Sequence, residues 1–344
     1  MAQTLHLVIP GLLGPWPQAN EQGFPQPKAP ALEQLLRRAK VAHTGITGLE
    51  ATLFDLLKIQ THAQSRDDDL PAAAVTALAD GYASADGWWM RADPVHLHAD
   101  LHQVLLFDAR HLDIDDAEAQ ALVTAFNHTF TDLGGTLTAP HPTRWYLRLD
   151  APPRLRTYSI GETIGHNINL LLPYGPDSQR WHTLLTEIQM LFHANPVNLK
   201  REIQQQLPIN SVWFWGGGYL PKADAATDSI YSATTLAKGL ALLTDAKLKM
   251  LPISASDWHT SAAEDNECLV VFDGLEREAF DWSAQIDRLE KDWFAPLLAL
   301  LRRQSLQLVL YPDNGLRFTC SRATLRRFWQ RPRALAVYLK NHTQ

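Results

Sequence analysis

One turn of the chain combines an amide, an ammonium and a guanidinium group. The run Asn195-Pro196-Val197-Asn198 is followed by Lys200 and Arg201. These groups together can hold a phosphate or a carboxylate, because an arginine side chain binds such anions through two parallel hydrogen bonds. The same residues could instead cap a helix and face solvent. The spacing therefore predicts either an anion site or an ordinary helix start.

A second segment, 210–221, is an aromatic strand that runs into the consecutive glycines Gly216, Gly217 and Gly218. Backbone amides without a nearby Cβ atom can approach an anion closely, and Asn210 could orient it. The segment is not a nucleotide-binding loop, because Lys222 is not followed by Ser or Thr and the glycine spacing differs. A tight turn at a crowded strand end is the alternative interpretation.

The third segment contains Asp93, His96 and His98, with His102 close by. On a strand His96 and His98 share one face, so the pattern permits a metal site, although loops also contain such histidines without metal. Hydrolase chemistry has little support. The Gly-x-Ser-x-Gly motif is absent, and neither cysteine has a histidine beside it.

The elements that position these segments are predicted from hydrophobic periodicity. Before residue 208 we expect a first strand over 5–9, helices over 31–40, 48–60 and 72–79, strands over 87–90 and 104–108, a helix over 117–133, a strand over 143–149 and a helix over 180–193. After residue 208 strands over 212–215, 248–253, 268–272 and 306–311 alternate with helices over 232–243 and 283–303.

That alternation predicts an α/β fold whose mainly parallel sheet is covered by helices. The middle third differs, because it combines a strand of alternating polarity with paired helices. We therefore expect a discontinuous core formed by residues 1–86 and 205–344, with an α+β domain inserted as residues 87–204.

Composition excludes several classes of function. The 344 residues carry 31 Lys and Arg against 37 Asp and Glu, a net charge of −6, so nucleic acid is not an expected partner. Two cysteines are too few for a disulfide framework or a four-cysteine zinc site, which fits a reducing compartment. The apolar run 5–13 is interrupted by Pro10 and lacks a basic flank, so we expect no signal peptide, no membrane span and a cytoplasmic location.

Two of these segments resemble signatures of a known enzyme family. Residues 192–198 with Arg201, and residues 208–221, resemble the His-Pro-Val-Asn-x-x-Arg and Ala-Asn-x-Ile-Trp-x-x-Gly-x-Gly motifs of archaeal-type cofactor-independent phosphoglycerate mutases. Residues 87–89, 91–97 and 213–218 look closer still to bacterial E-type regulators of pathogenicity factors, distant relatives of those mutases. The resemblance implies an alkaline-phosphatase-like core, an inserted domain, two divalent metals and a serine nucleophile.

The implied metal positions are mostly not matched in this chain. The first-strand Asp of the family pattern falls near Pro10, and the Asp-x-x-Gly-His pattern falls on residues 273–277, which keep Asp273 without the His. The next Asp-His pair corresponds to Asp313 and Asn314, and the last His-bearing loop lies near 328–332, again without His. Asp273 and Asp313 are the remaining candidate ligands, whereas two divalent ions need several.

The nucleophile is not identified either. Thr47, Thr61 and Ser65 lie in about the right region, but no motif selects one of them.

These observations lead to three predictions of function. The first is a non-catalytic relative that regulates or binds a phosphorylated metabolite or another anion, needs no cofactor, and uses a pocket formed by Asn198, Arg201, Asn210, Gly216, Gly217, Gly218, Arg91 and His96. The second is an active mutase or phosphatase with an altered manganese or zinc site. The third is a protein-interaction module that uses exposed tryptophans, of which the chain has eleven in all, to bind a protein partner.

Overall fold

The computed structural model describes residues 3–14, 27–60, 69–82, 87–100, 103–224, 227–275, 279–327, 329–330 and 333–339. The chain forms two compact units. We call Met1–Ile59 with Ala223–Gln344 the core unit, and Gln60–Lys222 the inserted unit. The short paired strands β3 (Ile59–Gln60) and β9 (Lys222–Ala223) lie where the chain passes from one unit to the other.

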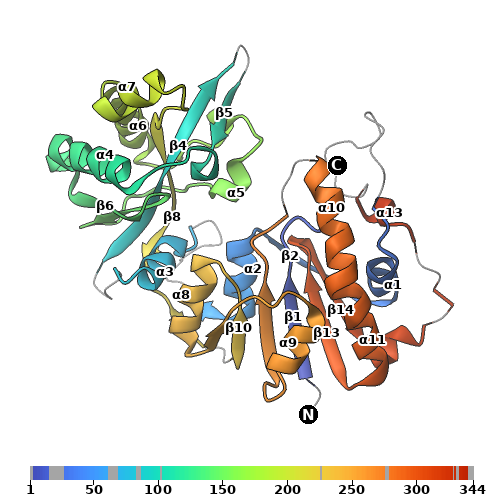
Figure 1. Cartoon of the computed structure of the whole chain (residues 1–344). Coiled ribbons are helices and arrows are strands. Elements are labelled where there is room, and N and C mark those ends of the chain that lie inside the picture. Colours follow the sequence, from blue (N-terminus) through green and yellow to red (C-terminus); the bar gives the residue numbers. More distant parts are fainter. Residues whose placement is uncertain are drawn as a thin grey trace. The chain divides into compact units, whose positions relative to one another are not determined.

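The core unit contains a seven-stranded sheet in the order β11-β10-β12-β1-β13-β14-β2. β1 pairs in parallel with β12 and β13, β10 pairs in parallel with β11 and β12, and β14 runs antiparallel between β13 and β2 (Figure 1). The strands are β1 (Gln3–Val8), β2 (Lys40–Thr47), β10 (Ser229–Tyr231), β11 (Lys247–Lys249), β12 (Glu267–Val271), β13 (Leu306–Tyr311) and β14 (Asn314–Ser321). The prediction of a mainly parallel sheet is confirmed.

One face of this sheet is buried under helices because its inward residues are almost all apolar. Leu5, Leu7, Leu308 and Leu310 pack in one cluster with helix residues such as Trp293. The helices of the unit are α1 (Pro30–Arg38), α2 (Leu49–Leu56), α8 (Thr235–Thr244), α9 (Ala255–Ser261), α10 (Ala279–Leu289), a π-helical turn (Glu290–Phe294), α11 (Ala295–Arg303), α12 (Arg322–Leu325) and α13 (Leu335–Leu339).

The inserted unit is an α+β layer structure built on antiparallel strands. The long β4 (Trp88–Ala99) pairs with β7 on one side and β8 on the other, and its far end pairs with β5. The other strands are β5 (Val104–Phe107), β6 (Gly135–His141), β7 (Arg144–Leu149) and β8 (Ser211–Tyr219). The helices are α3 (Ala72–Ala79), α4 (Asp116–Thr129), α5 (Ile160–Thr163), α6 (Ser178–His193) and α7 (Pro196–Ile203), with 3₁₀ turns at Ala109–His111, Thr131–Leu133 and Ile168–Leu170.

The unit boundaries differ from the sequence prediction. Residues 60–86 and 205–222 were expected in the core but fall in the inserted unit. The reason is packing: β8 pairs along most of β4, and α3 packs against both strands, with Ala73, Ala74 and Ala77 in one cluster with Trp89. Long-range pairing of this kind leaves no signal in local periodicity.

Two predicted elements are also corrected. The helix expected over 283–303 begins at Ala279 and is interrupted by the π-helical turn, after which it continues as α11. The edge strand β2 and its neighbour β14 were not predicted, because β2 alternates only between exposed and half-buried residues. Within the described residues no helix has the length and apolarity needed to cross a membrane.

Candidate functional site

Asp273 and Asp313, the two acids implied by the family resemblance, both lie at the carboxyl edge of the core sheet. Asp273 follows β12, and Asp313 follows β13 in a left-handed conformation with φ of 67°. The hydroxyl group of Thr52 donates a hydrogen bond of 3.0 Å to Oδ1 of Asp313. No group of three His, Cys, Asp or Glu residues that could hold a metal ion occurs among the described residues. Asp273 and Asp313 alone would supply fewer ligands than two divalent ions need.

A cavity of about 600 Å³ also lies at the carboxyl edge of the core sheet. Its walls come from the segment after β11, the segment after β12, and the helix formed by α10 and the π-helical turn. The lining residues are Leu251, Pro252, Ile253, Phe272, Gly274, Leu275, Ala284, Gln285, Arg288, Leu289, Asp292 and Trp293. Sequence reasoning missed this cavity, because its only lining residues within a motif, Gly274 and Leu275, were considered as part of a metal-binding pattern and not as a pocket wall.

Arg201 and Asn198 are used for packing inside the inserted unit. Arg201 is 1% exposed, and its guanidinium donates to Glu118 Oε2 at 2.7 Å and to the carbonyls of Leu207 and Leu112. The Asn198 side chain bonds both to the carbonyl and to the amide of Ile209 at 2.8 Å. These contacts fasten α7 to α4 and to the start of β8.

The side chains of Asn210 and His96 also form hydrogen bonds to backbone groups, near the end of β4. The Asn210 side chain accepts from the Leu97 amide at 2.7 Å and donates to the Leu97 carbonyl at 2.9 Å. His96 Nδ1 lies 2.9 Å from the Pro208 carbonyl oxygen, and burial lowers the pKa of this histidine. Both side chains therefore fix the strand that leads to the glycines.

The three glycines lie far from Arg201. Gly217 is eight residues beyond Ile209 along an extended segment, which corresponds to about 26 Å. Figure 1 shows α7 and α3 at opposite ends of the inserted unit. The predicted convergence of Asn198 and Arg201 with the glycine turn is therefore not found. The cause is that β8 is nine residues long, Ser211–Tyr219, and pairs along β4 from Val95 to Trp88.

Close packing explains the glycines. A Cβ atom on Gly217 would lie 2.4 Å from the Trp88 ring, and one on Gly218 would lie 2.5 Å from Pro71. Gly216 has φ of 67°, a conformation that favours glycine. The Gly217 amide does meet an anion, but this anion is the chain's own Asp69 carboxylate, whose pKa is raised by burial.

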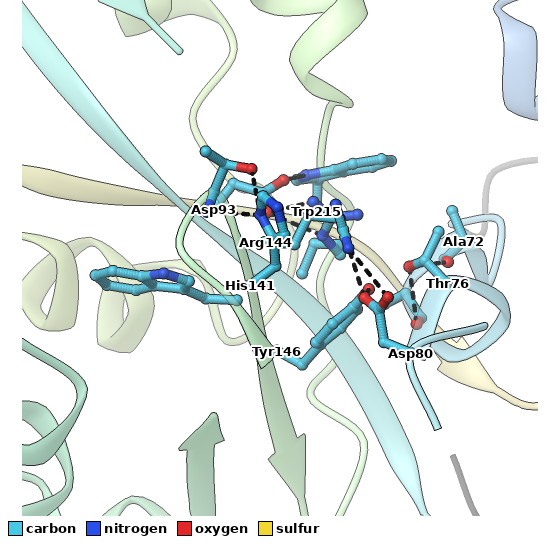
Figure 2. Close-up of polar contacts among 12 residues, drawn as sticks. Ala72, Thr76, Asp80, Asp93, His141, Arg144, Tyr146 and Trp215 are labelled. Atoms are coloured by element: carbon cyan, nitrogen blue, oxygen red, sulfur yellow. Dashed lines mark hydrogen bonds and ion pairs between the residues drawn. The ribbon is translucent and has the colours of Figure 1, made fainter. Parts of the chain in front are cut away.

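Arg91 lies at the centre of a buried polar network in the inserted unit. Its Nε and Nη2 atoms donate to Asp93 Oδ1 at 2.9 and 2.5 Å, while Trp215 Nε1 donates to Asp93 Oδ2 at 2.8 Å. The guanidinium carbon lies 5.2 Å from the centre of the Tyr146 ring and 5.3 Å from that of Trp215. Figure 2 shows Asp93 and Trp215 facing each other within this network.

The network extends to α3 through Asp80. Tyr146 donates its hydroxyl hydrogen to Asp80 Oδ2 at 2.8 Å, and Arg144 binds both oxygens of Asp80 at 3.0 Å (Figure 2). Burial alone would raise the pKa of Asp80, but the hydrogen bonds from Arg144 and Tyr146 outweigh it and lower the pKa. Sequence reasoning missed Asp80, Arg144 and Tyr146. The alternating strand over 143–149 was the signal that could have suggested them.

Other nucleophile candidates gain no support. Thr47 is exposed at the end of β2, while Thr61 and Ser65 lie outside the described residues. Both cysteines are free and buried, and burial raises the pKa of Cys268 and that of Cys320 to about 12. These thiols stay protonated at neutral pH, so they are poor nucleophiles.

Part of this sequence is similar to the sequences of a known enzyme family. The 2,3-bisphosphoglycerate-independent phosphoglycerate mutase of Methanosarcina mazei is 34% identical over 84 residues, which are 23% of this chain and 21% of that enzyme. The corresponding enzyme of Methanosarcina acetivorans is 35% identical over 77 residues, 21% of this chain and 19% of the enzyme. The match thus spans about a fifth of each relative's length. No protein-family model matches the chain.

Comparison with solved structures found one similar fold over most of the chain and one weaker match. The PH0037 protein of Pyrococcus horikoshii gives a TM-score of 0.55 at 12% identity, over 93% of this chain and 87% of that one. The cofactor-independent phosphoglycerate mutase of Thermoplasma acidophilum gives 0.47 at 14% identity, over 93% and 90%. The chain is therefore related in part of its sequence to cofactor-independent phosphoglycerate mutases, and its α/β fold with a mainly parallel sheet is shared with a known structure.

Proposed function

We propose that this protein is a non-catalytic relative of the cofactor-independent phosphoglycerate mutases that binds a small organic anion and acts as a regulatory protein. Its partial homology to those enzymes supports the relationship. The anion site predicted around Arg201 is not part of this proposal, because the protein's own groups occupy that guanidinium. The ligand site is instead assigned to the carboxyl edge of the core sheet, where ligands bind in open α/β sheets.

One observation carries the non-catalytic part of the proposal. The resemblance implies two metal ions at the carboxyl edge of the core sheet, where Asp273 and Asp313 lie. Among the described residues, no cluster of three or more His, Cys, Asp or Glu side chains could hold a metal ion. Two adjacent divalent cations repel each other strongly and need several anionic or imidazole ligands to offset their charge. Asp313 also accepts a hydrogen bond from Thr52, which occupies part of its capacity as a ligand.

The direct experiment measures metal content and turnover on one purified sample. The protein is incubated with Mn²⁺ or Zn²⁺, its bound metal is quantified after desalting, and conversion of 3-phosphoglycerate to 2-phosphoglycerate is followed. We expect fewer than two equivalents of retained metal and no turnover above the background. The matched control is the double variant Asp273→Asn, Asp313→Asn, because activity that this variant keeps comes from a contaminating enzyme.

Two retained metal ions per chain, together with turnover that the double variant loses, would contradict the proposal. That result would establish the alternative of an active mutase or phosphatase with an altered site.

A further inference from the structure

The cavity at the carboxyl edge of the core sheet has the size and wall chemistry of a small-molecule site. Its volume of about 600 Å³ lies within the range of ligand pockets, which is roughly 300–1,000 Å³. Leu251, Ile253 and Leu275 supply aliphatic surface. The rings of Phe272 and Trp293 meet edge to face, with centres 5.3 Å apart. These walls fit a planar or branched apolar body.

A local irregularity of the helix shapes one wall. Pro296 has no amide hydrogen, so the regular helical hydrogen-bond ladder is broken at this residue. Just before it, the amide of Ala295 bonds to the carbonyl of Glu290, five residues earlier. The resulting π-helical turn contains Asp292 and Trp293, and both of them line the cavity. Single π-helical turns within longer helices occur frequently at functional sites. This irregularity is a second indication, independent of the volume, that the cavity is a built site.

The charged residues of the lining indicate the kind of ligand. Arg288 is exposed and lines the cavity, where its guanidinium can bind a carboxylate or sulfonate. Asp292 lines the same cavity four residues later and opposes a second negative charge on the ligand. Gln285, one turn before Arg288, adds an amide to the same wall. The lining therefore favours a single negative charge over the dianion of a phosphate ester.

We propose that this cavity binds an amphipathic organic monoanion, with its apolar body between Phe272, Trp293 and the segment 251–253 and its acidic group at Arg288. The inference rests on the proposed function, because it assigns that function's ligand site and ligand class. It predicts that a phosphorylated three-carbon acid is a poor ligand, since such a molecule has no apolar body for these walls.

A fluorescence titration tests the site with two matched probes. The probe 8-anilinonaphthalene-1-sulfonate has an aromatic body and one negative charge, and N-phenyl-1-naphthylamine has the same body without the charge. We expect the anion to bind the full chain saturably at one site per chain. Arg288→Gln is expected to weaken binding of the anion by about tenfold and to leave binding of the neutral probe unchanged. Arg303→Gln, an exposed arginine outside the cavity, is the control and should change neither.

A second variant tests the cavity itself. Ala284 is exposed and lines the cavity, so Ala284→Trp should fill it and reduce the affinity of both probes by at least about tenfold. Ala299→Trp places the same side chain on the solvent face of α11 and should not affect them. Thermal unfolding verifies that each variant is folded.

Wild-type affinity for both probes in Ala284→Trp, or an equal loss of both probes in Arg288→Gln, would overturn the inference. The titration uses no metal and no phosphoglycerate, so its failure is separate from turnover, the result that would overturn the proposed function.

Discussion

The two units of this protein use charged residues in opposite ways. In the inserted unit, Arg91 and Arg201 are both buried and bonded to carboxylates of the same unit, Asp93 and Glu118. At the carboxyl edge of the core unit, Arg288 is exposed and lines a cavity with mostly apolar walls. The segments with the most specific sequence motifs therefore hold the inserted unit together, whereas the cavity of the core unit, where only residues 273–277 match part of a motif, has the shape of a binding site.

This difference shows why a motif is weak evidence for a binding site by itself. Arginine, asparagine and glycine suit anion recognition, but they also suit helix fastening and close backbone packing. Only the partners of each side chain distinguish the two roles. If these residues hold the inserted unit together, replacing them must lower its stability.

Replacing Arg201 should have the largest effect on stability. Arg201→Met keeps most of the side-chain volume but removes the guanidinium. The buried Glu118 carboxylate then loses its ion-pair partner, and the Leu207 carbonyl loses the hydrogen bond from Arg201. We expect the free energy of unfolding of the inserted unit to fall by about 3–5 kcal/mol in urea denaturation. Lys200→Ala, the exposed neighbour, is the control and should change it little. A loss below about 1 kcal/mol would show that Arg201 does not fasten α7 to α4.

Adding one methyl group at Gly217 should come next. Gly217→Ala places a Cβ atom 2.4 Å from the Trp88 ring, so either the ring or the strand must shift. We expect a loss of about 1–3 kcal/mol in the same urea experiment. Gly161→Ala is the matched control, because the nearest atom to its Cβ is 3.8 Å away and alanine favours a helix. Unchanged stability in Gly217→Ala would mean that close packing does not require glycine at this position, and that the residue has another role, such as binding a ligand.

Removing the Tyr146 hydroxyl should have a smaller effect. Tyr146→Phe loses the hydrogen bond to Asp80 but keeps the ring against Arg91, so only one link of the network is broken. We expect a loss of about 1 kcal/mol in the free energy of unfolding. Tyr219→Phe, at an exposed tyrosine of β8, should be neutral. A loss as large as that of Arg201→Met would show that the network is more cooperative than its single contacts.

The last prediction concerns pH. The pKa of Asp80 is lower in the folded protein than its ordinary value of 3.8. As the pH falls, Asp80 is therefore protonated in the unfolded chain before it is protonated in the folded protein. The contribution of Asp80 to stability is therefore complete above pH 3.8 and is lost as the pH falls through the lower folded pKa. Urea unfolding between about pH 5 and pH 2 should show a steeper loss in the wild type than in Asp80→Asn. Parallel curves would contradict the assigned shift.

The sequence predicted the fold better than the site, for physical reasons. Buried parallel strands such as β1 and β13 are short segments rich in apolar residues, and Asp115 caps α4 by accepting a hydrogen bond from the Glu118 amide, so both signals are local. The partners of Arg201 and Gly217 are not local. Arg201 bonds Glu118, 83 residues away, and Gly217 packs against Trp88 on a neighbouring strand.

The tryptophans illustrate the same limit. Trp88, Trp89, Trp213 and Trp215, which lie in the segments that resemble the family, are buried, and the indoles of Trp213 and Trp215 donate to the Tyr158 carbonyl and to Asp93. The cavity wall contains Trp293 instead, on a π-helical turn. Pro296, inside an otherwise helical pattern, was the only sequence signal for that turn.

Hydrogen exchange with and without 8-anilinonaphthalene-1-sulfonate tests most directly whether the core unit, rather than the inserted unit, holds the ligand. We expect the probe to slow amide exchange in 251–253, 272–275 and 284–293, the segments that form the cavity. Exchange in α7 and β8, which carry the family motifs, should stay unchanged. Protection confined to α7 or to the glycines of β8, with none around the cavity, would contradict the account.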